Sequence, residues 1–202
     1  MRRLALLPIL TLALACNDGS ITQPDTALQP GQDAPGIATS RGAGGVVELV
    51  TGSGHYTTQP PAFTPGLWRT FTMTARKYAD GSVKGSFTRV VHLADGGVDK
   101  LKGPITCFTI VGNTVWIAGE APGDNPPDIL WQVVDNGEGA GSPPDQNGLH
   151  LAATTFGWPA GFGQDFCDTT PAALDFGSFG GIVPLSALLF DIESGNIQIH
   201  VK

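Results

Sequence analysis

Residues 68–92 alternate polar and apolar side chains on both sides of a short turn, and this pattern strongly constrains the fold. A two-residue turn would place two lysines opposite each other and mix polar and apolar side chains on each face. A three-residue loop at residues 79–81 instead pairs Met73 with Phe87 and gathers the apolar side chains on one face. The sequence therefore predicts an antiparallel hairpin in the second register.

Two more segments predict hairpins of the same kind. Residues 105–120 turn at a Gly-Asn pair and set Phe108 opposite Ile117, which again gives one apolar face. Residues 188–201 show the same alternation around a Ser-Gly pair and predict a third hairpin. One-sided apolar faces are typical of antiparallel sheets that cover a core.

The rest of the chain points to the same fold class. Gly and Pro account for 44 of the 202 residues, and β-branched and aromatic residues form short runs between them. Further strands are expected at residues 46–51, 129–135 and 149–155, and no stretch of ten residues after position 44 shows a helical stripe. This pattern predicts an all-β fold, an antiparallel β-sandwich or partly open barrel of roughly nine or ten strands.

The chain begins with the pattern of an export signal. Arg2 and Arg3 precede an uncharged apolar stretch at residues 4–15, which predicts a signal peptide at residues 1–15. The stretch is too short for a transmembrane helix, which needs roughly 20 apolar residues.

Cys16 follows this stretch within the sequence Leu-Ala-Leu-Ala-Cys, which resembles the lipobox of bacterial lipoproteins. The resemblance implies a lipid on Cys16 and a cell-envelope protein anchored to a membrane. Ala13 stands where that family prefers Leu, and cleavage by an ordinary signal peptidase is the alternative, which would give a secreted or periplasmic soluble protein. Residues 16–43 are rich in Pro, Gly, Ser, Thr and Gln and predict a flexible tether before a single domain at residues 44–202.

The charge of the chain argues against a nucleic-acid partner. The formal net charge is −7, and removal of Arg2 and Arg3 with the signal peptide brings it to −9. A nucleic-acid or anionic-lipid partner is therefore disfavoured.

The chain has three cysteines, of which Cys107 and Cys167 are expected to form a disulfide in an oxidising compartment. This pairing leaves Cys16 over, in agreement with its lipidation. Two unpaired buried thiols are the alternative.

Two segments carry candidate binding residues. Asp135, Glu138 and Asp145 lie in a polar stretch whose oxygens are of the kind that calcium prefers, although the order does not match an EF-hand and a long turn is the simpler interpretation. Trp158 and Phe162 lie in a Gly-rich stretch that would form either a ligand platform or an aromatic cover over one end of the sheet.

The blocks at residues 52–55, 69–85, 105–107 and 133–139, the last together with residues 143–146, resemble a set of uncharacterised secreted bacterial proteins. The resemblance covers about residues 46–170. The resemblance implies secretion and transfers no catalytic residue.

No recognised catalytic motif occurs, and His55 and His150 lack sequence neighbours that would complete a catalytic relay. The chain is therefore expected to be a lipid-anchored binding or envelope-surface module for a carbohydrate or an envelope protein, with calcium as its candidate cofactor. A cell-envelope hydrolase with a scattered active site is the alternative.

Overall fold

The computed structural model describes residues 45–60, 65–123, 126–177 and 180–202. The predicted signal peptide, Cys16 and the tether to residue 43 lie outside these residues and stay predictions. The described residues belong to one compact unit, Ser40–Lys202. No helix among them is long and apolar enough to cross a membrane.

The described residues form twelve strands, one α-helix and two 3-10 helices. In chain order these are β1 (Val46–Thr57), β2 (Trp68–Tyr78), β3 (Val83–His92), β4 (Val98–Val111), β5 (Thr114–Glu120), β6 (Asp128–Val134), β7 (Gln146–Gly148), β8 (Leu151–Ala152), η1 (Ala153–Phe156), α1 (Phe162–Thr169), β9 (Ala173–Asp175), β10 (Ile182–Pro184), η3 (Leu185–Leu188), β11 (Leu189–Asp191) and β12 (Ser194–Val201).

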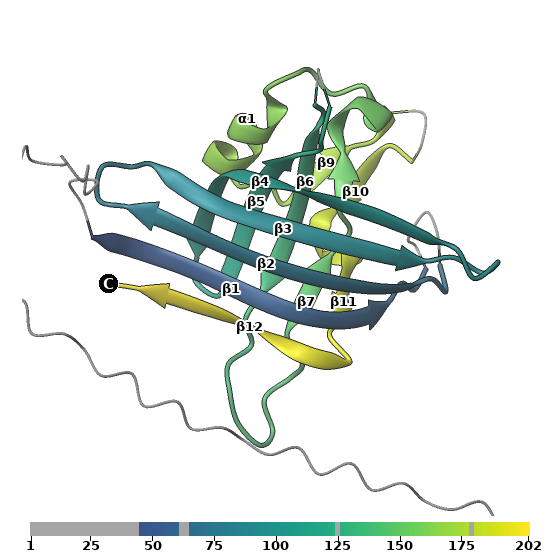
Figure 1. The fold of residues 1–202 in the computed structure, drawn as a ribbon, viewed down its shortest axis with the longest axis horizontal. Coiled ribbons are helices and arrows are strands. Elements are labelled where there is room, and N and C mark those ends of the chain that lie inside the picture. The colour runs from purple at the N-terminus through teal and green to yellow at the C-terminus, as the bar shows by residue number, and fades with distance from the viewer. Residues whose placement is uncertain (1–44, 61–64, 124–125, 178–179) are drawn as a thin grey trace, which may run out of the picture. The chain divides into compact units, whose positions relative to one another are not determined.

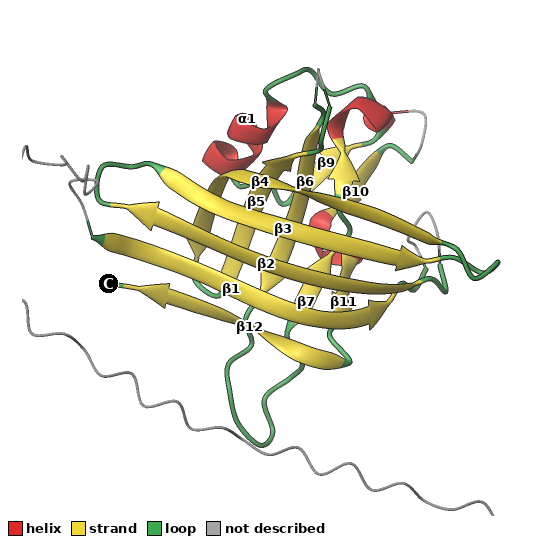
Figure 2. Ribbon diagram, in the orientation of Figure 1, coloured by secondary structure: helices red, strands yellow, loops and turns green. Residues whose placement is uncertain are grey.

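Nine of these strands form one curled half-barrel sheet, in the order β11-β7-β6-β5-β4-β3-β2-β1-β12 (Figures 1 and 2). β8 pairs with β6, and β9 and β10 form a separate small sheet. The strand pairs are antiparallel, which confirms the predicted all-β antiparallel class.

The sheet curls at β4. The first part of β4 pairs with β3 up to Pro104, whereas the second part pairs with β5, and the register shifts between Ile105 and Cys107. A bulge of this kind bends a strand and increases its twist. As a result, the long strands β12, β1, β2 and β3 lie across the shorter strands β5, β6, β7 and β11 (Figure 1). The main core cluster contains buried side chains from both halves, such as Phe71 and Trp131.

Two of the predicted hairpin registers are confirmed. Met73 pairs with Phe87 in the hairpin of β2 and β3, and Phe108 pairs with Ile117 in the hairpin of β4 and β5. Gly81 has φ +83°, the left-handed conformation that the three-residue loop requires. The ring centroids of Phe87 and Trp131 lie 5.0 Å apart, so the apolar faces of the two halves meet in the interior.

The predicted third hairpin is wrong. β11 pairs with β7 and β12 pairs with β1, so these consecutive strands lie at opposite ends of the strand order. Ile192 and Glu193 join them, and their N–H groups donate to the carbonyls of Asp145 and His55. The alternation of apolar residues predicted which side chains face the core, but it does not distinguish a hairpin from two strands that line the same interior.

The stretch after β6 also differs from expectation. The strand expected at residues 149–155 is reduced to β8 and is followed by η1, and α1 was not predicted. α1 has eight residues and includes a glycine, so its helical pattern is too short to recognise. The N–H of Gly163 in its first turn donates to Asp128 Oδ2 at 3.0 Å.

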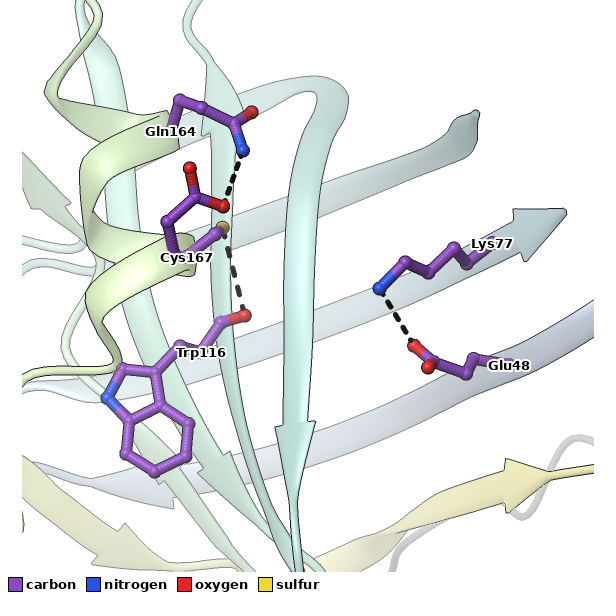
Figure 3. Close-up of polar contacts among 6 residues, drawn as sticks. Glu48, Lys77, Trp116, Gln164 and Cys167 are labelled. Carbon is purple, nitrogen blue, oxygen red and sulfur yellow. Dashed lines mark hydrogen bonds and ion pairs between the residues drawn. The ribbon is translucent and has the colours of Figure 1, made fainter. Parts of the chain in front are cut away.

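The predicted disulfide between Cys107 and Cys167 is confirmed, with 6.2 Å between the Cα atoms. It ties α1 to the outer side of β4 and β5. Figure 3 shows Cys167 beside the backbone of Trp116, with 4.0 Å between its sulfur and the carbonyl oxygen. Because the disulfide sulfur carries no hydrogen, this is a packing contact.

Candidate functional site

The outward side of the long strands carries a regular array of hydroxyl groups, called the hydroxyl face below. Alternate residues of β2, such as Phe71 and Met73, are buried, so the intervening threonines point outward. The pairing aligns two of these threonines with hydroxyl side chains on both neighbouring strands, in the rows Ser53-Thr72-Thr88 and Thr51-Thr74-Ser86. The hydroxyl face comprises Thr51, Ser53, Thr70, Thr72, Thr74, Ser86 and Thr88.

A polar groove of about 310 Å³ lies on this face. The side chains of Thr51, Ser53, Thr72, Thr74 and Ser86 line it, together with Asn196 of β12. Such side chains offer both hydrogen-bond donors and acceptors to a polar ligand.

An exposed aromatic side chain stands at one end of the hydroxyl face. Trp68 is 42% exposed, and its ring centroid lies 4.0 Å from that of His92 on β3. His55 of β1 meets the same indole edge-on at 5.6 Å. The two imidazoles fix the position of the indole and leave part of it open to solvent.

Four exposed cations adjoin the hydroxyl face. Arg76 pairs with Lys84 across β2 and β3, and the two lysines of β4 extend the hydroxyl rows, since Lys102 pairs with Thr88 and Lys100 with Val90. Side chains of paired residues point to the same side of a sheet, so these cations share the outward side. A chain with a net charge of −7 thus carries a locally positive surface beside its hydroxyl face.

The predicted calcium residues lie in the loop between β6 and β7, and each binds β12. Asp145 Oδ2 accepts the backbone N–H of Ile197 at 2.6 Å, and Asp135 Oδ2 accepts that of Ile199 at 3.0 Å. Glu138 Oε1 accepts the side-chain amide of Asn196 at 2.9 Å. The three carboxylates therefore hold the outer edge of β12.

Calcium binding by this loop stays a prediction. Within the described ranges of the chain, no three His, Cys, Asp or Glu side chains are grouped in a way that could hold a metal ion. An ion at this loop would have to compete with the hydrogen bonds to β12.

The candidate platform of Trp158 and Phe162 packs against other aromatic side chains. Trp158 lies 5.3 Å from Phe162 and 5.1 Å from Phe156, measured between ring centroids, and meets Phe176 at 5.3 Å. Its indole N–H donates to the carbonyl of Asp175 at 2.9 Å. This geometry fits an aromatic cover, and ligand binding by Trp158 and Phe162 stays a prediction.

A polar cluster in the interior was missed at the sequence level. Arg69 is 5% exposed and pairs with Tyr56, which is fully buried. Arg89, two residues from Phe87 on β3, and His150, which stacks on Trp131 at 4.6 Å, complete the group. The sequence contained a signal for this cluster, because Arg69 and Arg89 each lie two positions from a core residue of the same strand, Phe71 and Phe87, and so point to the same side.

Burial changes the ionisation of this cluster. It raises the pKa of Tyr56, an effect that Arg69 and a hydrogen bond with Asn147 partly oppose. Burial, followed by Arg89 and Arg69, lowers the pKa of His150 well below its usual 6.5. Both side chains are therefore neutral near pH 7. Burial also lowers the pKa of Arg69, an effect that the nearby Tyr56 partly opposes.

No protein-family model, curated protein or solved structure matches this chain. Any function must therefore be inferred from the geometry of its own residues.

Proposed function

We propose that this protein is an extracytoplasmic binding module, held at a membrane by a lipid on Cys16, whose hydroxyl face binds an acidic polysaccharide. The observation that carries the proposal is that the exposed indole of Trp68, the hydroxyl rows and four surface cations share the outward side of β2, β3 and β4. The three kinds of group lie on one continuous sheet surface.

Each group suits a different part of an acidic sugar chain. The apolar face of a sugar ring packs on an indole, as Trp68 offers. Sugar hydroxyls exchange hydrogen bonds with Thr72, Ser53 and Asn196 in the groove. Uronate carboxylates pair with Lys100 and Lys102, whose contribution is modest and sensitive to salt because both side chains are exposed.

The hydrolase alternative lacks a comparable arrangement. His55 Nε2 lies 3.5 Å from Glu193 Oε2. In a hydrolase the imidazole of His55 would act as the base, and the carboxylate of Glu193 would orient it. A hydroxyl within hydrogen-bond reach would be needed as the nucleophile, and the described part of the chain shows none bonded to His55. His150 is buried against Phe87 and Trp131.

Binding of purified polysaccharides by the mature protein tests the proposal. We expect polygalacturonate to retard the protein in affinity electrophoresis and neutral dextran to do so far less, with the difference falling as salt is added. Trp68→Ala should weaken binding about tenfold, the loss expected for one stacked ring of this kind. The double variant Lys100→Gln, Lys102→Gln should weaken it about fivefold.

Two matched variants control for loss of exposed surface groups elsewhere. Ile182→Ala removes an apolar side chain that is 75% exposed on the small sheet, and Lys202→Gln removes an exposed cation at the end of the chain. Neither should change the affinity. Failure of the wild-type protein to bind polygalacturonate, or equal binding by Trp68→Ala, would overturn the proposal.

The calcium-dependent form of the proposal links the carboxylate loop to the groove. Glu138 holds the Asn196 amide, and Asn196 lines the groove, so an ion at Asp135, Glu138 and Asp145 would reposition a groove side chain. Calorimetric titration with Ca²⁺, followed by polysaccharide binding in Ca²⁺ and in EDTA, tests this form. If the titration shows no heat of binding and the affinities in Ca²⁺ and in EDTA are identical, the calcium-dependent form is wrong. Polysaccharide binding by the hydroxyl face would not be affected by that result.

A further inference from the structure

The outward side chains of β2 form a line with a different chemical group at each end. Trp68 stands at one end and Arg76 at the other. Eight residue steps at about 3.3 Å each put these two positions about 26 Å apart. The outward residues between them are all threonines, Thr70, Thr72 and Thr74. β2 thus presents an aromatic ring, then hydroxyl groups, then a cation in one direction along the strand.

β3 lies beside β2 and repeats this order, because the two strands pair over their whole length (Figure 1). At the cationic end Lys84 pairs with Arg76, and at the aromatic end His92 pairs with Trp68. The outward residues of β3 between these ends are Ser86, Thr88 and Val90. The two strands together form one path along the hydroxyl face, called the β2–β3 path below.

The distribution of carboxylates distinguishes the β2–β3 path from the direction across the strands. β2 and β3 themselves contain no acidic residue. Toward β12, in contrast, Glu138 accepts the side-chain amides of Asn196 and Gln198 at 2.9 and 3.2 Å. Glu193 Oε2 lies 3.5 Å from His55 Nε2 on the same side. An anionic chain that crossed the strands toward β12 would approach both carboxylates and be repelled, whereas a chain along β2 and β3 would not.

Cations border the β2–β3 path on one flank and at one end. Lys100 and Lys102 of β4 flank it beside β3, and Arg76 and Lys84 close its end. Asp80, in the turn beyond this end, accepts hydrogen bonds from the N–H and the hydroxyl of the serine two positions later. An anionic chain on this path therefore meets positive charge along its flank and at one end, and the indole at the other end.

We propose that the acidic polysaccharide lies parallel to the strands on the β2–β3 path, from the indole of Trp68 to the guanidinium of Arg76. Ser53 and Asn196 of the groove then lie beside the chain. The ligand is an extended stretch of several uronate rings, because a disaccharide reaches only one end of a path about 26 Å long. This inference rests on the function proposed above, and it adds the direction and the length of the bound chain.

Oligogalacturonates of defined length test the length of the bound chain. In calorimetric titrations of the mature protein, octagalacturonate should bind at least about thirtyfold more tightly than digalacturonate, because it links contacts at both ends of the path. A gain of this size exceeds the statistical advantage of the overlapping dimers within the longer chain. The double variant Arg76→Gln, Lys84→Gln should reduce the gain about fivefold. Lys77→Gln is the matched control and should leave the gain unchanged, because Lys77 points to the inward side of β2, where it meets Glu48 and the ring of Phe108.

An NMR titration of the ¹⁵N-labelled mature protein tests the direction of the bound chain. Octagalacturonate should shift the indole N–H of Trp68 and the backbone amide of Arg76 together, with one saturation curve. The indole signal is assigned by its absence from Trp68→Phe. A chain that crosses the strands would instead shift the amides of one transverse row, such as Asn196-Ser53-Thr72-Thr88-Lys102, and leave Trp68 and Arg76 unshifted.

The outcomes separate this inference from the proposed function. Failure of the wild-type protein to bind polygalacturonate would overturn both. If polygalacturonate binds, then equal affinity for the two oligomers, a full gain in the Arg76 and Lys84 double variant, or the transverse pattern of shifts would overturn only the chain along β2 and β3. The comparison of the two oligomers with the wild-type protein decides even if the double variant does not fold.

Discussion

The carboxylate of Asp145 accepts the backbone N–H of Ile197 at 2.6 Å, although 52 positions separate the two residues in sequence. β12 ends the strand order of the main sheet, so its N–H groups on the side away from β1 have no neighbouring strand. Asp145 satisfies the N–H of Ile197 and Asp135 that of Ile199. Side chains thus protect an edge that would otherwise be open to pairing with another chain.

Loss of the Asp145 carboxylate should destabilise the domain. Its Oδ1 also accepts the N–H of Asn136 at 2.7 Å, so Asp145→Ala leaves two backbone donors without an acceptor. We expect the free energy of unfolding, measured in urea, to fall by about 2 to 4 kcal/mol. Glu138→Gln, at an exposed residue of the same loop, should change it by less than about 0.5 kcal/mol. Equal losses in both variants would contradict the edge-protecting role of Asp145.

The hairpin registers could be predicted because a turn and a buried face constrain each other. In β2 and β3 only the three-residue loop put Phe71, Met73 and Phe87 on one side, and the structure has that register. The placement of β11 and β12 at opposite ends of the strand order could not be predicted. It depends on the bend in β4 and on contacts of Ile192 with a loop almost 50 residues away, which leave no periodic signal.

The candidate site residues also differ in whether the sequence could predict their positions. The sequence predicted that the outward threonines of β2 face solvent, because their parity is opposite to that of the core. It did not predict that Asp135 and Asp145 reach β12, because these hydrogen bonds join segments that are distant in sequence. The same parity puts Arg69 and Arg89 on the core side of their strands, but arginine is seldom buried, and the interior cluster was not predicted.

The domain should become less stable as the pH is lowered below about 6.5, because of His150. Its pKa in the folded protein is well below 6.5, whereas in the unfolded chain it returns to about 6.5. The unfolded state therefore binds more protons as the pH falls, and stability decreases with a slope of up to about 1.4 kcal/mol per pH unit. His150→Gln should remove this slope between about pH 5.5 and 6.5, and His200→Gln, at an exposed position, should retain it. A slope that persists in His150→Gln would assign it to other groups.

Removal of the disulfide should loosen α1 and lower the stability of the whole domain. The bridge between Cys107 and Cys167 spans 60 positions, for which the chain-entropy model gives about 4 kcal/mol as an upper figure. The double variant Cys107→Ala, Cys167→Ala should show a loss up to this size in urea unfolding. Amides of α1 should exchange with deuterium much faster in the variant, whereas those of β2 should change only with the global stability. If exchange became faster by the same factor in α1 and β2, beyond the change expected from global stability, the bridge would have no local role at α1.

A side chain at Gly103 should disturb the bend in β4. A Cβ atom there would lie 1.8 Å from the carbonyl oxygen of Glu120 and 3.3 Å from the ring of Phe87. Because the first of these neighbours is backbone, relief requires β4 and β5 to move apart at the place where the sheet curls. We expect Gly103→Ala to cost about 3 kcal/mol or more in urea unfolding, at the upper end of the range for overpacked cores. Gly45→Ala, where a Cβ meets nothing within 4 Å, is the matched control and should be nearly neutral. A neutral Gly103→Ala would mean that the close approach of β4 and β5 does not set the curvature of the sheet.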